Sequence, residues 1–247
     1  MIATINHLSK EFKVDLSKPI DISIPLKNGD NNPIAWYVPP VKIEAVVMDD
    51  WIGEVKQGGS VNFFSISFNP HGHGTHTECV GHISKQKESV NDLVKTFFFL
   101  SQLISVNPSP HDGDLIITKA SIEASFEEGA EAVILRTMPN EKGKLTRHYS
   151  NTNPPFLSHE AATFLKDKKV KHLLIDLPSV DKEVDGGQLL AHHAFWNFPE
   201  NTRTDCSITE LIYVPNHILD GIYLLNLSFA PFDNDASPSR PTLFQLL

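Results

Sequence analysis

The order of apolar and polar segments predicts a mixed α/β fold in which some strands pair in parallel. Two short apolar runs, at residues 112–120 and 130–138, are bounded by Gly and Asp, and a third run at residues 171–181 has the pattern of a buried strand that ends in a polar loop. Segments 121–129 and 158–170 lie between them and have the pattern of short amphipathic helices. Strand, helix and strand therefore alternate, which is the order that parallel neighbours require.

Local signals indicate where some of these elements end. Ser158 offers a hydroxyl that can cap the second helix, and lysines fill the C-terminal end of that helix. Gly129 is placed to end the first helix as a C-terminal cap. The tail segment "DGIYLLNLSFAPF", residues 220–232, predicts a further strand.

Two segments rich in β-forming residues, 41–50 and 59–69, come earlier in the chain. Gly58 and Gly59 between them predict a turn. A strand followed by a loop would then carry residues 70–78 to one end of the sheet.

Composition narrows the class of protein. The chain has 247 residues, 40% hydrophobic and 21% charged, so it can bury a substantial core. A formal net charge of −9 without a basic stripe argues against nucleic acid as a partner. Cys79 and Cys206 are the only cysteines, so no disulfide framework is expected. No signal-peptide pattern and no apolar run long enough for a bilayer occur, so we expect no membrane contact and a cytoplasmic location.

The segment "NPHGHGTHTECVGHI", residues 69–83, gathers four of the twelve histidines, His71, His73, His76 and His82, together with Glu78. Neutral imidazole and carboxylate are preferred ligands of zinc and manganese, and the glycines let a loop bend so that several side chains converge. His76 and Glu78 share one face if the segment is extended. His71 or His73 could complete the set from the preceding turn. A single histidine is more often a surface or hydrogen-bonded residue, but four beside a carboxylate favour a metal site.

The sequence lacks the motifs of several other classes of enzyme. "HEAAT" at His159 lacks the second histidine of the zincin motif, and neither cysteine has the spacing that zinc deaminases need. Neither a nucleophile elbow nor a phosphate-binding glycine loop is present. Cys79 adjoins a ligand candidate, and we expect it to pack inward rather than act as a nucleophile.

A second group of donors lies downstream. His192 and His193 follow a polar loop, and Glu210 lies inside the apolar run "SITELIYV". A carboxylate at an apolar position is costly to bury unless it is paired or bound to a metal. Glu210 is therefore either a ligand or a salt-bridged residue at a sheet edge.

The sequence resembles the cyclase family of metal-dependent hydrolases, which contains bacterial kynurenine formamidase and isatin hydrolase. That family carries H-x-G-T-H-x-D-x-P-x-H, and this chain has "GHGTHTECVGH" at residues 72–82. The resemblance continues through "AVILRT", "LLIDLPSVD", "AHHAFW", "ITELIYV" and the terminal "DGIYLLNLSFAPFDNDASPSRPTLFQL". It implies one domain over residues 1–247, with a swivelling β/β/α-type fold, a mixed sheet and assembly as a homodimer.

The resemblance also implies roles for individual residues. His76, Glu78, His192 and Glu210 match metal ligands of the family, with His193 as the alternative to His192, and His82 matches a histidine that transfers protons. Gly72 stands where the family has its first histidine. A shift of one residue would place His71 or His73 there, and we favour His71. Glu78 replaces an aspartate and Val80 a proline, so the substrate can differ from that of the formamidases.

One or two divalent ions, zinc or manganese, would then activate water to hydrolyse a small amide, an aryl formamide like N-formylkynurenine, or a lactam. A non-catalytic metal-binding protein or a metal-dependent lyase or cyclase are the alternatives. Arg136 and Arg147 are candidates to hold a substrate carboxylate. Five aromatic residues are candidates for the wall of a substrate pocket, although such residues more often belong to the core: Trp36, Tyr37, Trp51, Phe63 and Trp196.

Overall fold

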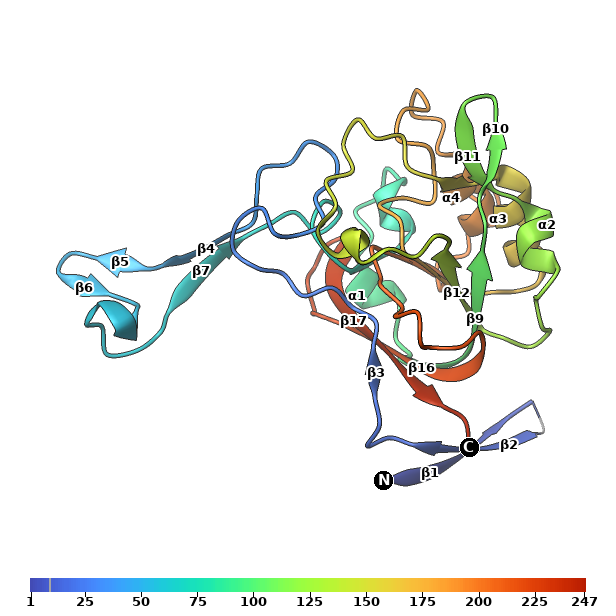
Figure 1. The fold of residues 1–247 in the computed structure, drawn as a ribbon, viewed down its shortest axis with the longest axis horizontal. Helices are drawn as coiled ribbons and strands as arrows, with labels where there is room; N and C mark the ends of the chain where they lie inside the picture. The colour runs from blue at the N-terminus through green and yellow to red at the C-terminus, as the bar shows by residue number, and fades with distance from the viewer. Residues whose placement is uncertain (9) are drawn as a thin grey trace.

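Seven strands form a closed ring at the centre of the molecule (Figure 1). The computed structural model describes residues 1–8 and 10–247. Around the ring the order is β16, β9, β12, β14, β15, β8 and β17, and β17 pairs again with β16. The strands are β8 (His76–Glu78), β9 (Phe98–Val106), β12 (Ala132–Thr137), β14 (His172–Ile175), β15 (Ser207–Glu210), β16 (Gly221–Phe229) and β17 (Ala236–Gln245), with β3 (Ile20–Asp21) beside β17. Strands β9, β12, β14 and β15 are parallel. The predicted runs 130–138 and 171–181 form the parallel neighbours β12 and β14, as expected, but the run 112–120 is not part of this sheet: its strand β11 (Asp114–Ile117) pairs in a separate small sheet.

The parallel strands are buried on both faces, which explains their continuous apolar sequence. Every residue of β12 and of β14 is buried. Successive side chains point to opposite faces. Ile134 packs in a cluster shared by strands of the ring. Val133 and Leu135 pack instead in a second cluster, which contains residues of three helices.

Those helices are α2 (Lys119–Glu123), α3 (His159–Asp167) and α4 (Leu190–Trp196). The predicted cap of α3 is confirmed, because Ser158 Oγ accepts a hydrogen bond from the Ala161 N–H (3.1 Å). The prediction that the first helix reaches Gly129 is wrong, since α2 ends at Glu123. After Glu123 the chain leaves the helical path, and Phe126 packs edge-on against Phe164 of α3, at 5.4 Å between ring centroids.

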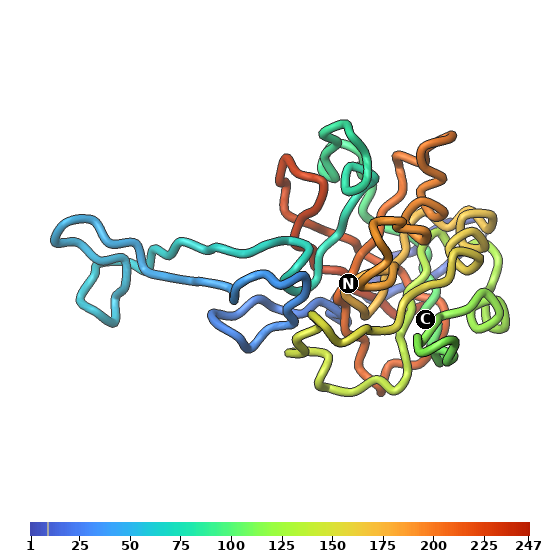
Figure 2. The backbone as a smooth tube through the Cα atoms, turned by 90° about the horizontal axis from the view of Figure 1, so that it is seen from above, coloured from blue at the N-terminus to red at the C-terminus, as the bar shows by residue number. Residues whose placement is uncertain are grey.

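Residues 42–67 form an arm that extends far from the ring (Figures 1 and 2). It contains β4 (Lys42–Ala45), β5 (Val47–Met48), β6 (Trp51–Ile52), the short 3-10 helix η1 (Val55–Gln57) and β7 (Phe64–Ser67). The two predicted strands do pair, as β4 with β7. Their turn lies between β5 and β6, whereas Gly58 (φ 95°) ends η1. The arm is separate from the main sheet, but β7 and the loop after it lead to β8 of that sheet, so the expectation that a strand and a loop carry residues 70–78 to a sheet is confirmed.

The remaining elements are small. They are the hairpin of β1 (Ile2–His7) and β2 (Lys10–Asp15), the sheet of β10 (Ser109–His111), β11 (Asp114–Ile117) and β13 (Phe156–Leu157), the helix α1 (Val90–Leu93) and the 3-10 helices η2 (Val80–His82) and η3 (Lys142–Thr146). Among the described residues, no helix has the length and apolar character needed to cross a bilayer.

Candidate metal centre

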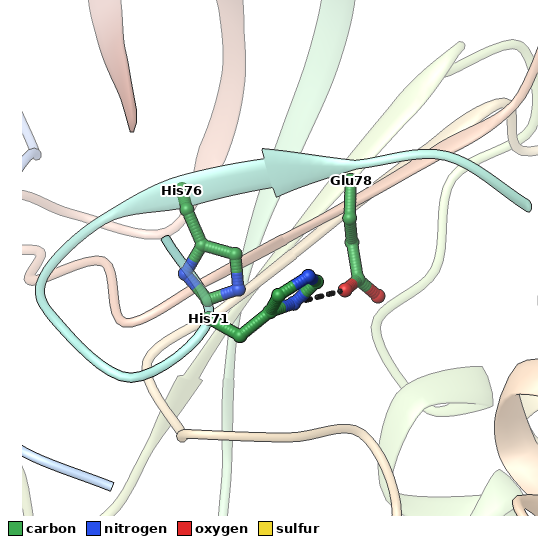
Figure 3. Close-up of side chains that lie close together, drawn as sticks. All are labelled: His71, His76 and Glu78. Carbon is green, nitrogen blue, oxygen red and sulfur yellow. Dashed lines mark ion pairs between the residues drawn. The ribbon is translucent and has the colours of Figure 1, made fainter. Parts of the chain in front are cut away.

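Strand β8 places two of the predicted donors on one face of the sheet (Figure 3). His76 and Glu78 are two residues apart in an extended strand, so their side chains point the same way. Glu210 lies directly across from His76 in the antiparallel pair of β8 and β15. The distance from His76 Nε2 to Glu210 Oε2 is 3.4 Å. All three side chains are buried, which is costly for a carboxylate without a partner.

Glu78 lies at the centre of the cluster. Its Oε2 is 3.1 Å from His71 Nδ1, and its Oε1 is 3.1 Å from His192 Nε2. His82 Nδ1 is 3.9 Å from Glu78 Oε2. Burial alone would raise the pKa of Glu78, but the neighbouring histidines hold it well below its ordinary value.

The loop before β8 turns His71 toward Glu78 and His73 away from it. His73 Nδ1 accepts from the Asn69 N–H (2.9 Å), and its Nε2 lies 2.9 Å from the Pro39 carbonyl oxygen, to which it donates. A Cβ atom at residue 72 would lie 2.6 Å from Val38 Cγ2, so only glycine fits at this bend. The structure therefore brings His71, rather than His73, into the cluster.

Helix α4 likewise directs only one of its two neighbouring histidines toward the cluster. His192 is buried and points to Glu78, whereas His193 Nδ1 lies 3.1 Å from the Phe198 carbonyl oxygen. Behind His192, Asp181 Oδ2 lies 2.6 Å from Nδ1. Asp181 also accepts from the N–H groups that begin α4, so it fixes both the helix and the ring.

Asp235, just before β17, is a second carboxylate that the sequence analysis missed. Its Oδ2 lies 2.8 Å from His71 Nε2 and 3.4 Å from His82 Nδ1. His71 therefore lies between two carboxylates, Glu78 and Asp235. No local spacing links Asp235 to His71, which is 164 residues earlier in the chain. The only signal was that both Asp181 and Asp235 lie inside segments that resemble the cyclase family.

These carboxylates change the acid–base properties of two histidines. Burial by itself would lower the pKa of His71, but the hydrogen bond to Asp235 and the close negative charges of Glu78 and Asp235 outweigh burial and raise it to about 10. Burial acts on His192 in the same way, and Asp181 and Glu78 raise the pKa of this residue to about 10. Without a metal, both imidazoles therefore hold a proton at neutral pH.

Two buried side-chain atoms of the cluster lack a hydrogen-bond partner in the part of the chain that the structure describes. Among the described residues, His76 Nε2 and Glu78 Oε2 belong to the few buried side-chain atoms with no hydrogen-bond partner. Glu78 Oε2 does lie close to His71, but their geometry is poor for a hydrogen bond. Nitrogen and oxygen donors converge within 4.8 Å in three overlapping sets: His71, His76 and Glu78; Glu78, His82 and His192; and His71, His82 and Asp235. Such a donor set fits a divalent cation of the zinc or manganese type.

A cavity of about 410 Å³ opens beside the cluster. Besides His71, His82, His192 and Glu210, it is lined by Trp36, Val38, Asn69, Ser179, Lys182, Glu183, Asp185 and Leu189. A volume of this size fits a small molecule. The donor cluster therefore faces a space that a substrate can enter.

Most of the predicted pocket aromatics lie elsewhere in this chain. Trp36 borders the cavity, and the Tyr37 hydroxyl lies next to it, 3.2 Å from Glu183 Oε1. Trp51 and Phe63 pack against each other on the arm, and Trp196 is fully buried in the core.

Neither predicted arginine lines the cavity. Arg136 binds Asp220 (2.8 Å), Ser105 and two backbone carbonyl groups. Arg147 pairs with Glu141. The structure thus gives no support to the expectation that these arginines hold a substrate carboxylate. Cys79 is buried, and burial raises the pKa of its thiol to about 12, which agrees with the expectation that it is no nucleophile.

Comparison with known proteins now decides the family. A family model described as "Putative cyclase" matches residues 14–182. The chain belongs to the cyclase family. A kynurenine formamidase of Bacillus anthracis is 31% identical to this cyclase over 232 residues, which cover 92% of the chain and 97% of that protein. A kynurenine formamidase of Bacillus cytotoxicus is 28% identical over 229 residues, with 92% and 94% coverage.

Solved structures share the fold of this cyclase. An isatin hydrolase bound to the product analogue thioisatinate superposes with a TM-score of 0.65, at 16% identity and 93% coverage of each chain. A predicted metal-dependent hydrolase from Bacillus stearothermophilus gives 0.62, at 21% identity and 92% and 98% coverage. The predicted family and its mixed-sheet α/β fold are confirmed. The prediction of a metal-dependent hydrolase is confirmed at the level of the family, while the substrate and the ion stay predictions.

Proposed function

We propose that this cyclase hydrolyses a small amide, an aryl formamide or a lactam with water activated by a divalent metal ion. The ligands would be His71, His76, Glu78, His192 and Glu210, with His73 and His193 left out. One observation carries the proposal: a buried histidine–carboxylate cluster with two unpartnered donor atoms faces a cavity of about 410 Å³. The names of the curated relatives support the same chemistry.

The bound metal would lower the pKa of water toward about 7 and polarise the carbonyl group of the substrate. The chain supplies the rest. His82 is partly exposed at the cavity, with 31% of its side chain accessible, so it can pass a proton to the leaving nitrogen. Asp235 lies 3.4 Å from His82 Nδ1 and orients this ring, which leaves Nε2 for the proton. Trp36 and Leu189 give one part of the cavity an apolar lining.

The first test is metal content, measured by inductively coupled plasma mass spectrometry, together with hydrolysis of a panel of formamides and lactams. We expect about one or two equivalents of zinc or manganese per chain in the wild type. His71→Ala and His76→Ala should lose metal and activity together. His73→Ala is the matched control, because His73 binds only backbone groups of Asn69 and Pro39, and it should keep both. A protein that binds no metal after reconstitution would sink the proposal.

The number and kind of ion are part of the proposal. The two oxygens of Glu78 face different histidines, His71 and His192, so donors on both sides of this carboxylate would be available, which supports two ions per chain. Imidazole and carboxylate suit zinc and manganese equally, so the mass spectrum of the purified protein also decides between them.

We also propose a homodimer of this chain. The arm carries apolar side chains that are more than half exposed, and an isolated two-stranded hairpin is marginally stable in water. They include Val47 (64% exposed), Met48 (56%), Phe63 (55%) and Ile66 (58%). A second copy would cover them. Light scattering should give twice the chain mass for the wild type and for Lys56→Asp, and a monomer for Ile66→Asp; a wild-type monomer would contradict the dimer.

The location and the domain organisation are proposed on simpler grounds. Both cysteines, Cys79 and Cys206, are buried and unpaired, which suits the reducing cytoplasm. We propose one domain over residues 1–247, because both β3 near the start and β17 near the end pair within the main sheet. Limited proteolysis that released a stable fragment of the ring would contradict this.

A further inference from the structure

We propose that the substrate of this cavity is a flat aromatic amide or lactam that carries no carboxylate group. The inference rests on the proposed function and names the class of substrate for the same site. Two features of the cavity carry it: an aromatic wall that the backbone holds under strain, and a rim whose single cation is already paired.

The aromatic wall is Trp36. Both Trp36 and Tyr37 have φ 58°, in the left-handed region that non-glycine residues rarely adopt. Such a conformation is strained and persists only where the surroundings enforce it. Tyr37 is held by its N–H to Ser150 Oγ (2.9 Å) and by its hydroxyl group, which lies 3.1 Å from Asn151 Oδ1.

The indole of Trp36 also packs on the buried residues Ala35, Tyr149 and Leu211. It is therefore a fixed wall of the cavity rather than a mobile surface side chain. A rigid indole offers a flat face on which an aromatic ring can stack.

The only cationic side chain among the residues that line the cavity, apart from its histidines, is Lys182. Its Nζ donates to Asp114 Oδ2 at 2.7 Å. Asp114 is largely buried, and its other oxygen accepts from the Asn153 side chain (2.9 Å). The hydrogen bond from Lys182 also lowers the pKa of Asp114, so both groups stay charged and paired at neutral pH. Lys182 thus ties the loop of residues 178–189 to β11 and is not available to an anion.

The remaining charges on the rim are negative. Glu183 accepts from the backbone of Asn151 and Asn153, and Asp185 accepts from the N–H groups of Gly187 (2.8 Å) and Leu189 (2.6 Å). Backbone N–H groups carry no net charge, so Glu183 and Asp185 both keep their negative charge. On this rim, away from the proposed metal ligands, a substrate carboxylate would therefore meet two like charges and no unpaired lysine or arginine among the described residues. A charged group that loses water without gaining a partner is destabilised, so a carboxylate should weaken binding here.

A matched pair of substrates tests the charge rule. N-formyl-4-aminobenzamide and N-formyl-4-aminobenzoate have nearly the same shape and differ by one negative charge. With the metal-loaded protein we expect kcat/KM to be at least about tenfold higher for the neutral amide, as an unpaired carboxylate predicts. Equal or faster hydrolysis of the benzoate would overturn the inference.

Variants separate the roles of the lining residues. Lys182→Met should leave the ratio between the two substrates unchanged, since Lys182 is bound to Asp114. A further selective loss of the benzoate in this variant would show that Lys182 binds carboxylates and would overturn the inference. Trp36→Leu should lower kcat/KM about three- to tenfold for both substrates, because the aromatic contact is lost.

Binding of uncleaved analogues keeps this test apart from the proposed function. Calorimetry should give a Kd at least about tenfold lower for 4-acetamidobenzamide than for 4-acetamidobenzoate. If this preference holds while no formamide is hydrolysed, the proposed function fails and the substrate class stands. If formamides are hydrolysed but the benzoates bind as well as the benzamides, the substrate class fails and the function stands.

Discussion

Two clusters of buried charge in this cyclase differ in how fully their atoms are partnered. In the first, Lys144 is only 3% exposed, and its Nζ donates to Asp176 Oδ2 (2.7 Å), the Thr137 carbonyl (2.7 Å) and Thr137 Oγ1 (2.8 Å). Asp176 also accepts from the N–H and the hydroxyl of Thr137. Each charged group is satisfied by its neighbours, and neither lines the cavity beside the histidines.

The histidine cluster around Glu78 is built differently. His76 Nε2 and Glu78 Oε2 have no hydrogen-bond partner among the described residues, although both are buried. Histidines crowd one carboxylate, and a cavity opens beside them. Buried polar groups in proteins are almost always satisfied, so an unsatisfied group calls for an explanation. The comparison teaches that the first cluster supports the fold, whereas the second is arranged for a ligand.

The largest effect is expected from a substitution that breaks the first cluster. Lys144→Met leaves Asp176 buried without its cation and should lower the free energy of unfolding by about 3–5 kcal/mol. Urea denaturation measures this, with Lys18→Met as a control because Lys18 is exposed (80% of its side chain). Folded Lys144→Met protein should still bind metal. A loss of stability below about 1 kcal/mol would mean that the cluster is not structural.

A smaller effect is expected from pH, acting on the second cluster. The pKa values of His71 and His192 are raised to about 10 in the metal-free protein, so both rings are protonated below that pH. Metal binding requires neutral imidazole and must release these protons. The affinity for metal should therefore rise with pH, by up to about a hundredfold per unit if both rings lose a proton. Competition with a coloured chelator between pH 6 and 8 measures the slope; an affinity that is independent of pH would contradict the geometry.

The smallest expected effect concerns the carboxylates behind the histidines. Asp181→Asn keeps the shape of the side chain but removes the charge that orients His192, and it should weaken metal binding about ten- to hundredfold. Asp205→Asn is the control, because Asp205 is exposed and pairs with Lys171 on the surface. If both variants bind metal as the wild type does, Asp181 serves only to begin α4.

The sequence alone determined much of the fold and half of the site. Strands β12 and β14 follow from apolar runs, and α3 begins directly after Ser158 because the hydroxyl of this residue caps the helix. The spacing of His76 and Glu78 put both on one face, because side chains in a strand alternate. In each case the signal is local, and the periodicity of the backbone converts it directly into a direction in space.

Tertiary structure decided what local periodicity does not contain. His71 enters the cluster instead of His73 because Asn69 and the crowded position at Gly72 set the course of the loop. Asp181 and Asp235 reach their histidines through chain segments that are far apart in sequence or fixed by the start of a helix. The run 112–120 was predicted as a neighbour of the other parallel strands, but β11 pairs with β10 and β13 in a separate small sheet, because the pattern of a strand does not specify its partner. Pairing is set by contacts between distant segments, and these exist only once the chain has folded.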